Sequence, residues 1–494
     1  MMSVNWTARR YPDRPGDYRT DYERDYARIV HSASFRRLQA KTQVLGVGDG
    51  DFYRTRLTHT LEVSQIGVSI TKKLYREAEK RKQSGMVNSE EMHLLDAKLA
   101  ILPDPMLMSS ICLAHDIGHP PFGHGGEVAL NRCMLPYGGF EGNGQTLRII
   151  TKLDRYHENG GMNLTKRTVL GTIKYPARFS DAVNWSIRGL GGRPETSEVE
   201  MKGKPFLTRV PRNSIFVAEH FKPPKCYLDD EHDDVVMGWV RQGLEDDWAQ
   251  LSRVYDDDPG KKHPKPKFMS VDTSIMELAD DIAYGVHDLE DAIGLHLIDE
   301  KAFSAWLEQE DAKTSVKRKE LLAPYLSVRH GGQLSKMIKA LFSTKSHERK
   351  TEISSLVGFF VDAARLELDD HTKARSLPVF KEPIFRWKAV LPVDHEKALG
   401  ILKTMVAELV VKTTQVQQLE FKGQKIVTEL FEAFATDPKR LLDTRDYALT
   451  RQGGGDIPTP RVICDYIAGM TDEYATRRYQ QLFAPRVGSV FDKL

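Results

Sequence analysis

Residues 115–127 read HDIGHPPFGHGGE and carry three histidines and two carboxylates in one short run. Neutral imidazole and carboxylate together suit divalent Mn, Fe, Co, Ni or Zn, whereas a set of thiolates would point to structural zinc or an iron–sulfur cluster. Gly118 and Pro120-Pro121 favour a helix end, since glycine accepts a left-handed cap and proline cannot continue a helix. His115 and Asp116 are therefore expected at a rim that is open to substrate, and the run predicts a metallohydrolase.

The sequence around this run is mostly helical in pattern. Apolar residues recur at spacings of three and four in residues 22–43, 57–82, 91–113, 145–153, 276–293, 399–419 and 426–435. Alternating strand patterns are few and short, and a small β-hairpin is expected at 227–241 or around 207–217. The predicted fold class is all-α or mostly α, with at most this minor β-hairpin.

A charged region interrupts the helical pattern between about 190 and 268. It is rich in glycine, proline and charge, including DDEHDD at 229–234 and KKHPKPK at 261–267. Such a composition predicts an insertion or lid between core helices, and it is also typical of simple solvated loops. Both interpretations stay open at this point.

The chain of 494 residues is long enough for a substantial core. Its 71 basic and 69 acidic residues give a formal charge of +2, so any anion site must be local. A disulfide framework is not expected, because the cysteines are scattered without a CxxC pair: Cys112, Cys133, Cys226 and Cys464. With no apolar run near the roughly 20 residues of a membrane span, we expect no membrane association and a reducing, cytoplasmic location.

Two further segments contain side chains that could complete a metal site. His59 lies near the start of the predicted helix at 57–82, where a lone histidine is more often a core or surface residue. In the helix at 276–293, Asp280, Tyr284 and Asp288 follow one another at i, i+4 and i+8 on one face. Acids beside apolar residues are more often a solvated helix edge than ligands, so each segment alone is ambiguous.

The order of the motifs resembles that of a known family. They are FRRLQAKTQV at 35–44, RTRLTH at 54–59, the central run at 115–124, FEGN at 140–143, KY at 174–175, ADDIAYGVHD at 279–288 and DYIAGMTD at 465–472. In this order they resemble the HD-domain metallohydrolases, and specifically the deoxyguanosinetriphosphate triphosphohydrolases. The resemblance implies an HD-type helical core over residues 1–330, with the insertion at about 190–268. Residues 331–494 would form a C-terminal helical region for base recognition and oligomer contacts.

By this resemblance the metal ligands are His59, His115, Asp116 and Asp280. Four protein ligands on a six-coordinate ion leave two positions for water and a phosphate oxygen. The expected cofactor is a divalent ion, Mn²⁺ or Mg²⁺, with Co²⁺, Ni²⁺ or Fe²⁺ as alternatives.

The resemblance assigns the proton transfer to His124 and Glu127. If a helix begins near Gly123, their i, i+3 spacing lets the carboxylate orient the imidazole and raise its basicity. Glu127 would alternatively be only a first-turn acid that the helix dipole favours. His119 is expected to bind phosphate or to donate a proton.

Phosphate recognition must come from side chains, because the sequence contains no GxxxxGK[ST] loop. Arg56, three residues before His59, shares its helical face and can point at the phosphate. The resemblance adds Lys174, Tyr175 and Asn143, and places Lys222, in FKPPK at 221–225, at the terminal phosphates. Arg54 or Lys41 are alternatives.

The resemblance also implies a deoxynucleoside pocket. Gln43 and Val44 would leave no room for a 2′-hydroxyl, Asp288 would accept the 3′-hydroxyl hydrogen, and Tyr284 would stack beneath the sugar. Glu420 would accept hydrogen bonds from guanine, although a surface glutamate is the competing interpretation. Val411 stands where family members offer an aromatic residue, which weakens the case for strict guanine preference.

The function implied is hydrolysis of dGTP to deoxyguanosine and inorganic tripolyphosphate, by attack of metal-activated water at the α-phosphorus. The alternatives are a broader dNTP triphosphohydrolase, another HD-domain nucleotide phosphohydrolase, or a non-catalytic nucleotide-regulated binding protein. The resemblance further implies a homo-oligomer such as a hexamer, and a response to single-stranded DNA or to a second nucleotide. Local basic residues such as Lys439 and Arg440 offer a surface for nucleic acid.

Overall fold

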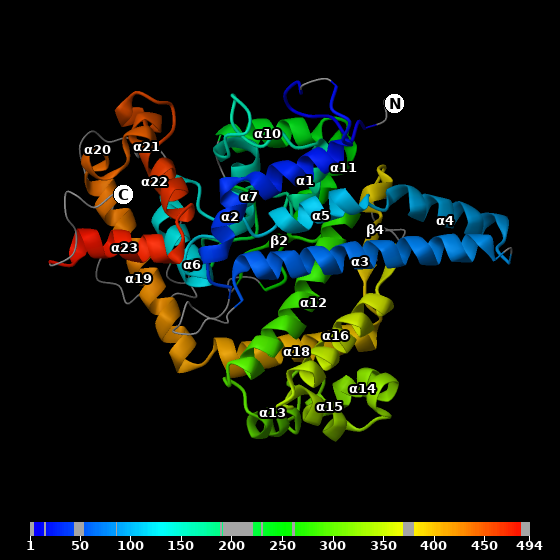
Figure 1. The fold of residues 1–494 in the computed structure, drawn as a ribbon. Helices are drawn as coiled ribbons and strands as arrows, with labels where there is room; N and C mark the ends of the chain where they lie inside the picture. Colours follow the sequence, from blue (N-terminus) through cyan, green and yellow to red (C-terminus); the bar gives the residue numbers. More distant parts are fainter. Residues whose placement is uncertain are drawn as a thin grey trace.

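The computed structural model describes residues 4–13, 16–43, 54–84, 86–187, 190, 221–228, 231–258, 262–368 and 380–485. These residues form helices and two small antiparallel sheets, so the predicted mostly-α fold class is confirmed. Figure 1 shows the helices crossing one another at several angles, with α12 passing beneath α3 and α19 linking the lower helices to those at the left.

The helices of the first half of the described chain are α1 Asp21–His31, α2 Ala33–Arg37, α3 Arg56–Gln83, α4 Ser89–Ile101, α5 Pro105–Ala114, α6 Gly123–Met134, α7 Gly142–Arg148, α8 Lys166–Thr172, α9 Phe179–Ala182, α10 Glu231–Arg241 and α11 Glu245–Leu251. Short 3₁₀ or π turns follow some of them, at Leu38–Ala40, Leu135–Tyr137 and Ile149–Leu153. In Figure 1, α3 and α4 extend together as an arm away from the other helices.

The second half contains α12 Val271–Gly294, α13 Glu300–Leu307, α14 Ala323–His330, α15 Leu334–Leu341, α16 Ser346–Ala363, α18 Val393–Val406, α19 Thr414–Thr436, α20 Pro438–Leu441, α21 Thr444–Leu449, α22 Thr459–Ala468 and α23 Asp472–Phe483. Short turns lie at Arg318–Leu322, Pro383–Phe385, Ala407–Val411 and Arg451–Gly453. The strands pair as β1 Val254–Tyr255 with β2 Lys265–Pro266, and β3 Arg365–Leu368 with β4 Trp387–Val390.

Three hydrophobic clusters hold these elements together, and the smallest includes Val128 and Phe179. The largest one surrounds α3, α5 and α12, and α5 lies at its centre because its sequence PMLMSSICLA is apolar almost throughout. The second cluster joins α6 to α19, α22 and α23 through residues such as Leu130, Leu430 and Ile467. The C-terminal helices therefore share a core with α6, which begins within the central run. The boundary near residue 330 stays a prediction.

The expected hairpin at 227–241 is wrong, because the chain forms the helix α10 there. Its first turn is acidic, which the helix dipole favours, and Val236, Met237 and Val240 bury one face at helical spacing. The alternative hairpin position around 207–217 lies outside the described residues. The two observed sheets lie elsewhere, at 254–266 and 365–390.

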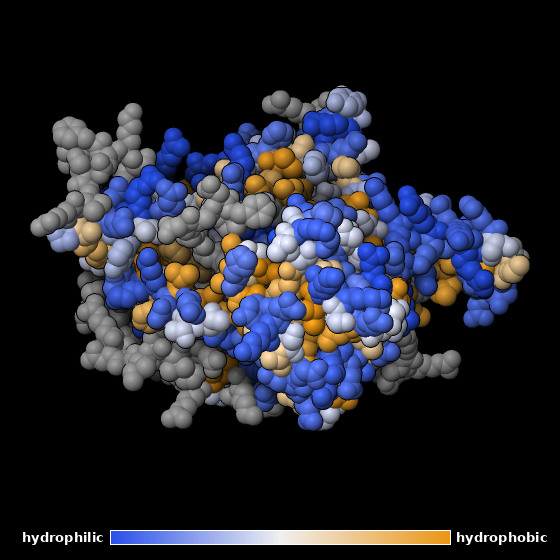
Figure 2. Space-filling model, turned by 60° about the horizontal axis from the view of Figure 1, so that its bottom comes forward, coloured by the Kyte–Doolittle hydropathy of each residue, from blue (hydrophilic) through white to orange (hydrophobic). Residues whose placement is uncertain are grey.

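Among the described residues, no single helix is long and apolar enough to cross a membrane, although the bent pair α4 and α5 meets the length and composition criteria together. All four cysteines are buried and free of disulfides. Figure 2 shows a face on which hydrophilic residues predominate and hydrophobic residues gather near the centre.

Candidate active site

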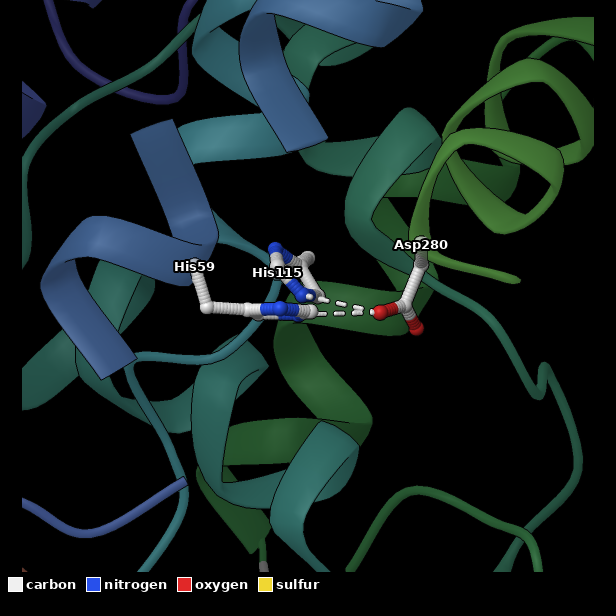
Figure 3. Close-up of side chains that lie close together, drawn as sticks. All are labelled: His59, His115 and Asp280. Atoms are coloured by element: carbon white, nitrogen blue, oxygen red, sulfur yellow. Dashed lines mark hydrogen bonds and ion pairs between the residues drawn. The ribbon is translucent and has the colours of Figure 1, made fainter. Parts of the chain in front are cut away.

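Three helices bring a cluster of metal-binding side chains together. His59 lies in the first turn of α3, His115 caps the end of α5, and Asp280 lies in the middle of α12. One ligand atom from each lies within 4.8 Å of the others. Figure 3 shows the two imidazole rings and the carboxylate pointing toward one another.

Gly67 makes this convergence of helices α3, α5 and α12 sterically feasible. A Cβ at this position would lie 2.8 Å from Cys112 Sγ and 3.7 Å from Ala279 Cβ. The absence of a side chain on α3 therefore lets α5 and α12 approach closely two turns beyond His59.

The orientation of His115 fits a metal ligand. Its Nδ1 lies 2.6 Å from the Cys112 carbonyl oxygen, so Nδ1–H donates to it and the Nε2 lone pair is left free. That Nε2 is buried without a hydrogen-bond partner and lies 3.8 Å from Asp280 Oδ1. His59 Nε2 lies 3.1 Å from the same oxygen. A buried imidazole nitrogen that faces a carboxylate in this way is suited to a divalent cation.

Asp116, the fourth predicted ligand, lies beside this cluster. Its Oδ1 is 3.4 Å from His115 Nε2 and 3.1 Å from His119 Nδ1, and its Oδ2 accepts a hydrogen bond from Arg56 at 2.6 Å. Burial alone would raise the pKa of Asp116, but the nearby His119, His115 and Arg56 hold it well below its usual range. The carboxylate is therefore ionised and free to join the three clustered ligands.

His124 and Glu127 form the expected pair on the first turn of α6, which begins at Gly123. Glu127 Oε2 lies 3.2 Å from His124 Nδ1, and Glu127 Oε1 accepts from the Gly142 amide at 2.9 Å. Burial opposes ionisation of Glu127, yet the hydrogen bond to His124 and the charge of Lys225 lower its pKa. The glutamate is buried while the His124 side chain is 75% exposed, so a fixed carboxylate orients an imidazole that substrate can reach.

One cavity of about 340 Å³ connects these groups. Its lining contains His115, Asp116, His124 and Asp280, but neither His59 nor Glu127. It also contains Arg56, Lys174 and Lys225 as cations, with Tyr175 and Asn143 beside them. Burial lowers the pKa of Lys174, but the Asp280 carboxylate 3.7 Å away outweighs this effect and raises it. Lys174 is therefore charged in a position facing the metal cluster.

The sequence favours Lys222 for the terminal phosphates, but Lys225 is the lysine of this segment that reaches the cavity. Lys225 lines the cavity and its Nζ lies 3.2 Å from Glu141 Oε1, whereas Lys222 is exposed and only its backbone carbonyl lies near His263. Both lysines lie in the short sequence FKPPK. The sequence indicates that a lysine of this segment reaches the site, but it does not show which of the two does so. The assignment of Lys222 to phosphate is not supported by the geometry.

The residues expected to contact the sugar and base separate into two groups. Gln43, Tyr284, Glu420 and Val411 line the cavity. Asp288 is buried and does not line it, and burial raises its pKa to about 7. Val44 lies outside the described residues. Thr42, Phe122 and Asp281 also line the cavity, and no sequence motif assigned them a role.

The clustered metal-binding residues do not line the larger cavities found among the described residues. One cavity of about 490 Å³ is lined by Lys41, Ile117 and Asp465 among others, and another of about 550 Å³ is lined by His232 and Arg461 among others. Neither contains His59, His115 or Asp280, so the smaller cavity is the candidate site.

The comparison with protein families matches the C-terminal part of the chain. Residues 389–481 match a family described as the phosphohydrolase-associated domain. This stretch begins in β4 and ends in α23, and it includes α19, which carries Glu420.

The chain is similar over nearly its whole length to proteins named deoxyguanosinetriphosphate triphosphohydrolase-like. One from Shewanella sp. (strain ANA-3) is 44% identical, over 99% of this chain and 98% of that protein. One from Shewanella baltica (strain OS185) is 43% identical with the same coverage. One from Shewanella sediminis (strain HAW-EB3) is 42% identical, over 100% of this chain and 99% of that protein.

Proposed function

Because the chain belongs to the deoxyguanosinetriphosphate triphosphohydrolase-like proteins of the HD superfamily, we propose that it hydrolyses dGTP to deoxyguanosine and inorganic tripolyphosphate. One observation carries the proposal: a single cavity is lined by His115 and Asp280 of the metal-binding cluster, by His124 and by three cations. Hydrolysis of a phosphoester requires a positioned water, neutralised phosphoryl oxygens and a proton for the leaving oxygen.

His59, His115, Asp116 and Asp280 would hold one divalent ion, Mn²⁺ or Mg²⁺, with Co²⁺, Ni²⁺ or Fe²⁺ as alternatives. A bound ion supplies Lewis acidity, which polarises a phosphoryl oxygen and acidifies a nearby water. The support is the free, buried Nε2 of His115, which faces the carboxylate of Asp280.

The cations of the cavity would bind the triphosphate. Arg56 already neutralises Asp116 at 2.6 Å and leaves its remaining donors for a phosphate oxygen. Lys174 and Lys225 face the same space, with Tyr175 and Asn143 as polar contacts. This arrangement would hold the α-phosphorus in front of the metal cluster.

His124 would supply the proton that the 5′-oxygen of deoxyguanosine needs when its bond to the α-phosphorus breaks. Attack of water at the same phosphorus then leaves the three phosphates joined as tripolyphosphate. Glu127 would fix the ring through Nδ1, so that Nε2 faces the reacting bond. His119, whose Nδ1 lies 3.1 Å from Asp116, would contact the phosphate or donate a proton.

The deoxynucleoside would lie between Gln43 and α19. Gln43 would exclude a 2′-hydroxyl, Tyr284 would pack against the sugar, and Glu420 would accept hydrogen bonds from the N1 and N2 hydrogens of guanine. Val411, Val416 and Leu419 add apolar surface that makes no base-specific hydrogen bond. This surface favours a broader dNTP triphosphohydrolase as the second candidate.

The test is to incubate the purified protein with each dNTP, and with GTP, in the presence of Mn²⁺ or Mg²⁺ and to identify the products. Tripolyphosphate plus nucleoside supports the proposal. Pyrophosphate plus monophosphate, orthophosphate, or no product would contradict it. Comparable rates with all four dNTPs would favour the broader enzyme.

His115→Ala should abolish turnover while the protein remains folded, which separates an enzyme from a non-catalytic nucleotide-binding protein. His347→Ala is the matched control, since His347 is exposed in the first turn of α16 and lies in no cavity described above. Homo-oligomer formation, such as a hexamer, and regulation by single-stranded DNA or a second nucleotide stay predictions.

A further inference from the structure

Two neighbouring segments of the cavity wall are held by the C-terminal part of the chain. Residues 41–43 contribute Thr42 and Gln43 to the lining, and residues 119–124 contribute His119, Phe122 and His124. Both segments bond to residues 468–472, which join α22 to α23.

Asp472 bridges the two segments with its two carboxylate oxygens. Oδ2 accepts hydrogen bonds from the Thr42 amide, at 3.0 Å, and from the Thr42 hydroxyl. Oδ1 accepts from the Phe122 amide at 2.9 Å. The side chain is 6% exposed, so these are buried, charge-assisted bonds that span 430 and 350 residues of sequence.

Lys41 makes a second connection between the same parts of the molecule. Its buried Nζ donates to the His119 carbonyl at 2.6 Å and to the Ala468 carbonyl at 2.9 Å. Lys41 and Asp472 therefore tie the two wall segments both to each other and to the end of α22. We call these two residues and the backbone groups that they bind the C-terminal clasp.

The hydrogen bond from the Phe122 amide to Asp472 lies where the backbone is strained. Phe122 is a non-glycine residue with φ of 62°, and it immediately precedes α6, which carries His124 and Glu127. A left-handed non-glycine residue costs energy and persists only where its surroundings enforce it. The Asp472 carboxylate accepts a hydrogen bond from the Phe122 amide and is one such restraint. Its loss should therefore loosen the backbone at the start of α6.

We propose that Asp472 is a positioning residue that sets the spacing between the sugar-contacting segment at 41–43 and the catalytic segment at 119–124. The inference rests on the proposed function, because it gives the two segments their roles. The proposal gives a structural role to the motif at 465–472, although no residue of this motif lines the cavity of the candidate site.

The test compares Asp472→Asn with Glu473→Gln. Both variants remove one carboxylate from the first turn of α23, but Glu473 is exposed and only pairs with Arg477 at 3.0 Å. Asparagine has one acceptor oxygen where aspartate has two, so it cannot hold both segments. We expect kcat of Asp472→Asn to fall about 10- to 100-fold, as expected for a small misplacement of catalytic groups. The preference for dGTP over GTP should also decrease, whereas Glu473→Gln should leave both quantities unchanged.

A second readout is independent of turnover. Amide hydrogen exchange, measured by mass spectrometry on the full chain, should become faster in peptides covering 41–43 and 118–126 in Asp472→Asn only. Mn²⁺ affinity should stay within about twofold of the wild-type value, since no metal-binding residue bonds to Asp472. Equal exchange and equal kcat in Asp472→Asn and Glu473→Gln would overturn the proposal.

Variants of Thr42 keep the proposal testable if Asp472→Asn does not fold. Thr42→Val removes the hydroxyl donor and keeps the backbone amide, whereas Thr42→Ser keeps both. We expect faster exchange at 118–126 and lower kcat in the valine variant, with rescue in the serine variant; identical behaviour of the two would refute the role. Failure of the wild-type protein to release tripolyphosphate would refute the proposed function alone, because the exchange measurement does not depend on it.

Discussion

The carbonyl oxygen of Cys112 determines which nitrogen of His115 faces the metal cluster. The last carbonyls of a helix lack partners within it, and α5 ends at Ala114, just before His115. The Cys112 oxygen is thus available to accept from Nδ1 at 2.6 Å, which turns Nε2 toward Asp280. A helix end therefore provides both the position and the tautomer of one ligand.

Removal of the charge of Glu127 should impair proton transfer more than binding. Both of its oxygens are in use, one by the Gly142 amide and one by His124. We expect Glu127→Gln to lower kcat for dGTP about 100-fold, within the range for a general acid or base, with KM changed less than about threefold. Glu158→Gln, at an exposed loop position, is the control. Steady-state kinetics check this, and near-normal kcat in the Glu127 variant would disprove the role.

Lys225, rather than Lys222, should contribute to substrate affinity. We expect Lys225→Met to lower kcat/KM for dGTP about 10- to 100-fold, since a hydrogen bond to a charged group contributes roughly 1.5–3 kcal/mol. Lys222→Met should stay within about twofold of the wild type, because its side chain is exposed. The opposite ranking of the two variants would restore the sequence-based assignment.

The buried lysine of the clasp makes stability depend on pH. Burial lowers the pKa of Lys41 from its usual 10.5 to about 7. Between these values the unfolded chain binds more protons than the folded one, so the free energy of unfolding should rise with pH by at most about 1.4 kcal/mol per unit. Urea unfolding of the wild type and Lys41→Met at pH 7, 8 and 9 tests this. The difference between them should grow in favour of the wild type, and parallel pH profiles would contradict the expectation.

The sequence predicts those parts of the site whose residues lie close together along the chain. The i, i+3 spacing of His124 and Glu127 needs only that a helix begin at Gly123, which it does. Asp472 was not identified as a bridge, because its partners lie 350 and 430 residues away and depend on tertiary packing. The choice between Lys222 and Lys225 has a related reason. The sequence FKPPK contains both lysines, and only the path of the backbone shows which of them faces the cavity.

At the scale of elements, periodicity located the helices but not all their ends. The pattern at 91–113 splits into α4 and α5, because Pro103 lies between them and Pro105, which is tolerated only in the first turn of a helix, begins α5. The pattern at 22–43 breaks at Ser32, which caps α2. The predicted hairpin at 227–241 is wrong because the apolar residues of 231–241 follow helical spacing and form α10.

The contact between α19 and the start of α6 depends on a glycine. A Cβ on Gly423 would lie 2.4 Å from Phe122 Cβ, whereas a Cβ on Gly400, within α18, would meet nothing within 4 Å. We expect Gly423→Ala to destabilise the protein by about 1–3 kcal/mol through overpacking. Gly400→Ala should stabilise it by roughly 0.5–1 kcal/mol. Urea denaturation measures both, and equal shifts in the same direction would show that the close approach does not matter.

At the scale of the whole molecule, the cavity is assembled from distant parts of the chain. Its lining takes residues from α3, α6, α12 and α19, which extend from residue 56 to residue 436. The second hydrophobic cluster buries α6 against α19, so the proposed proton-transfer pair on α6 and the proposed base-binding residue on α19 are supported by one core. Folding of the C-terminal helices is therefore a condition for a complete site.

Metal binding should consequently stabilise the entire fold. His59, His115 and Asp280 come from three helices that converge only in the folded chain, so an ion bound there favours the folded state. At Mn²⁺ concentrations about 100 times Kd, the expected gain is about 2.7 kcal/mol. With an unfolding entropy near 2.1 cal/mol/K per residue over 494 residues, this corresponds to a rise in Tm of about 3 °C. Differential scanning calorimetry with Mn²⁺ and then with a chelator measures the shift. His347→Ala should keep it and His115→Ala should lose it, whereas an equal rise in both variants would place the bound ion elsewhere.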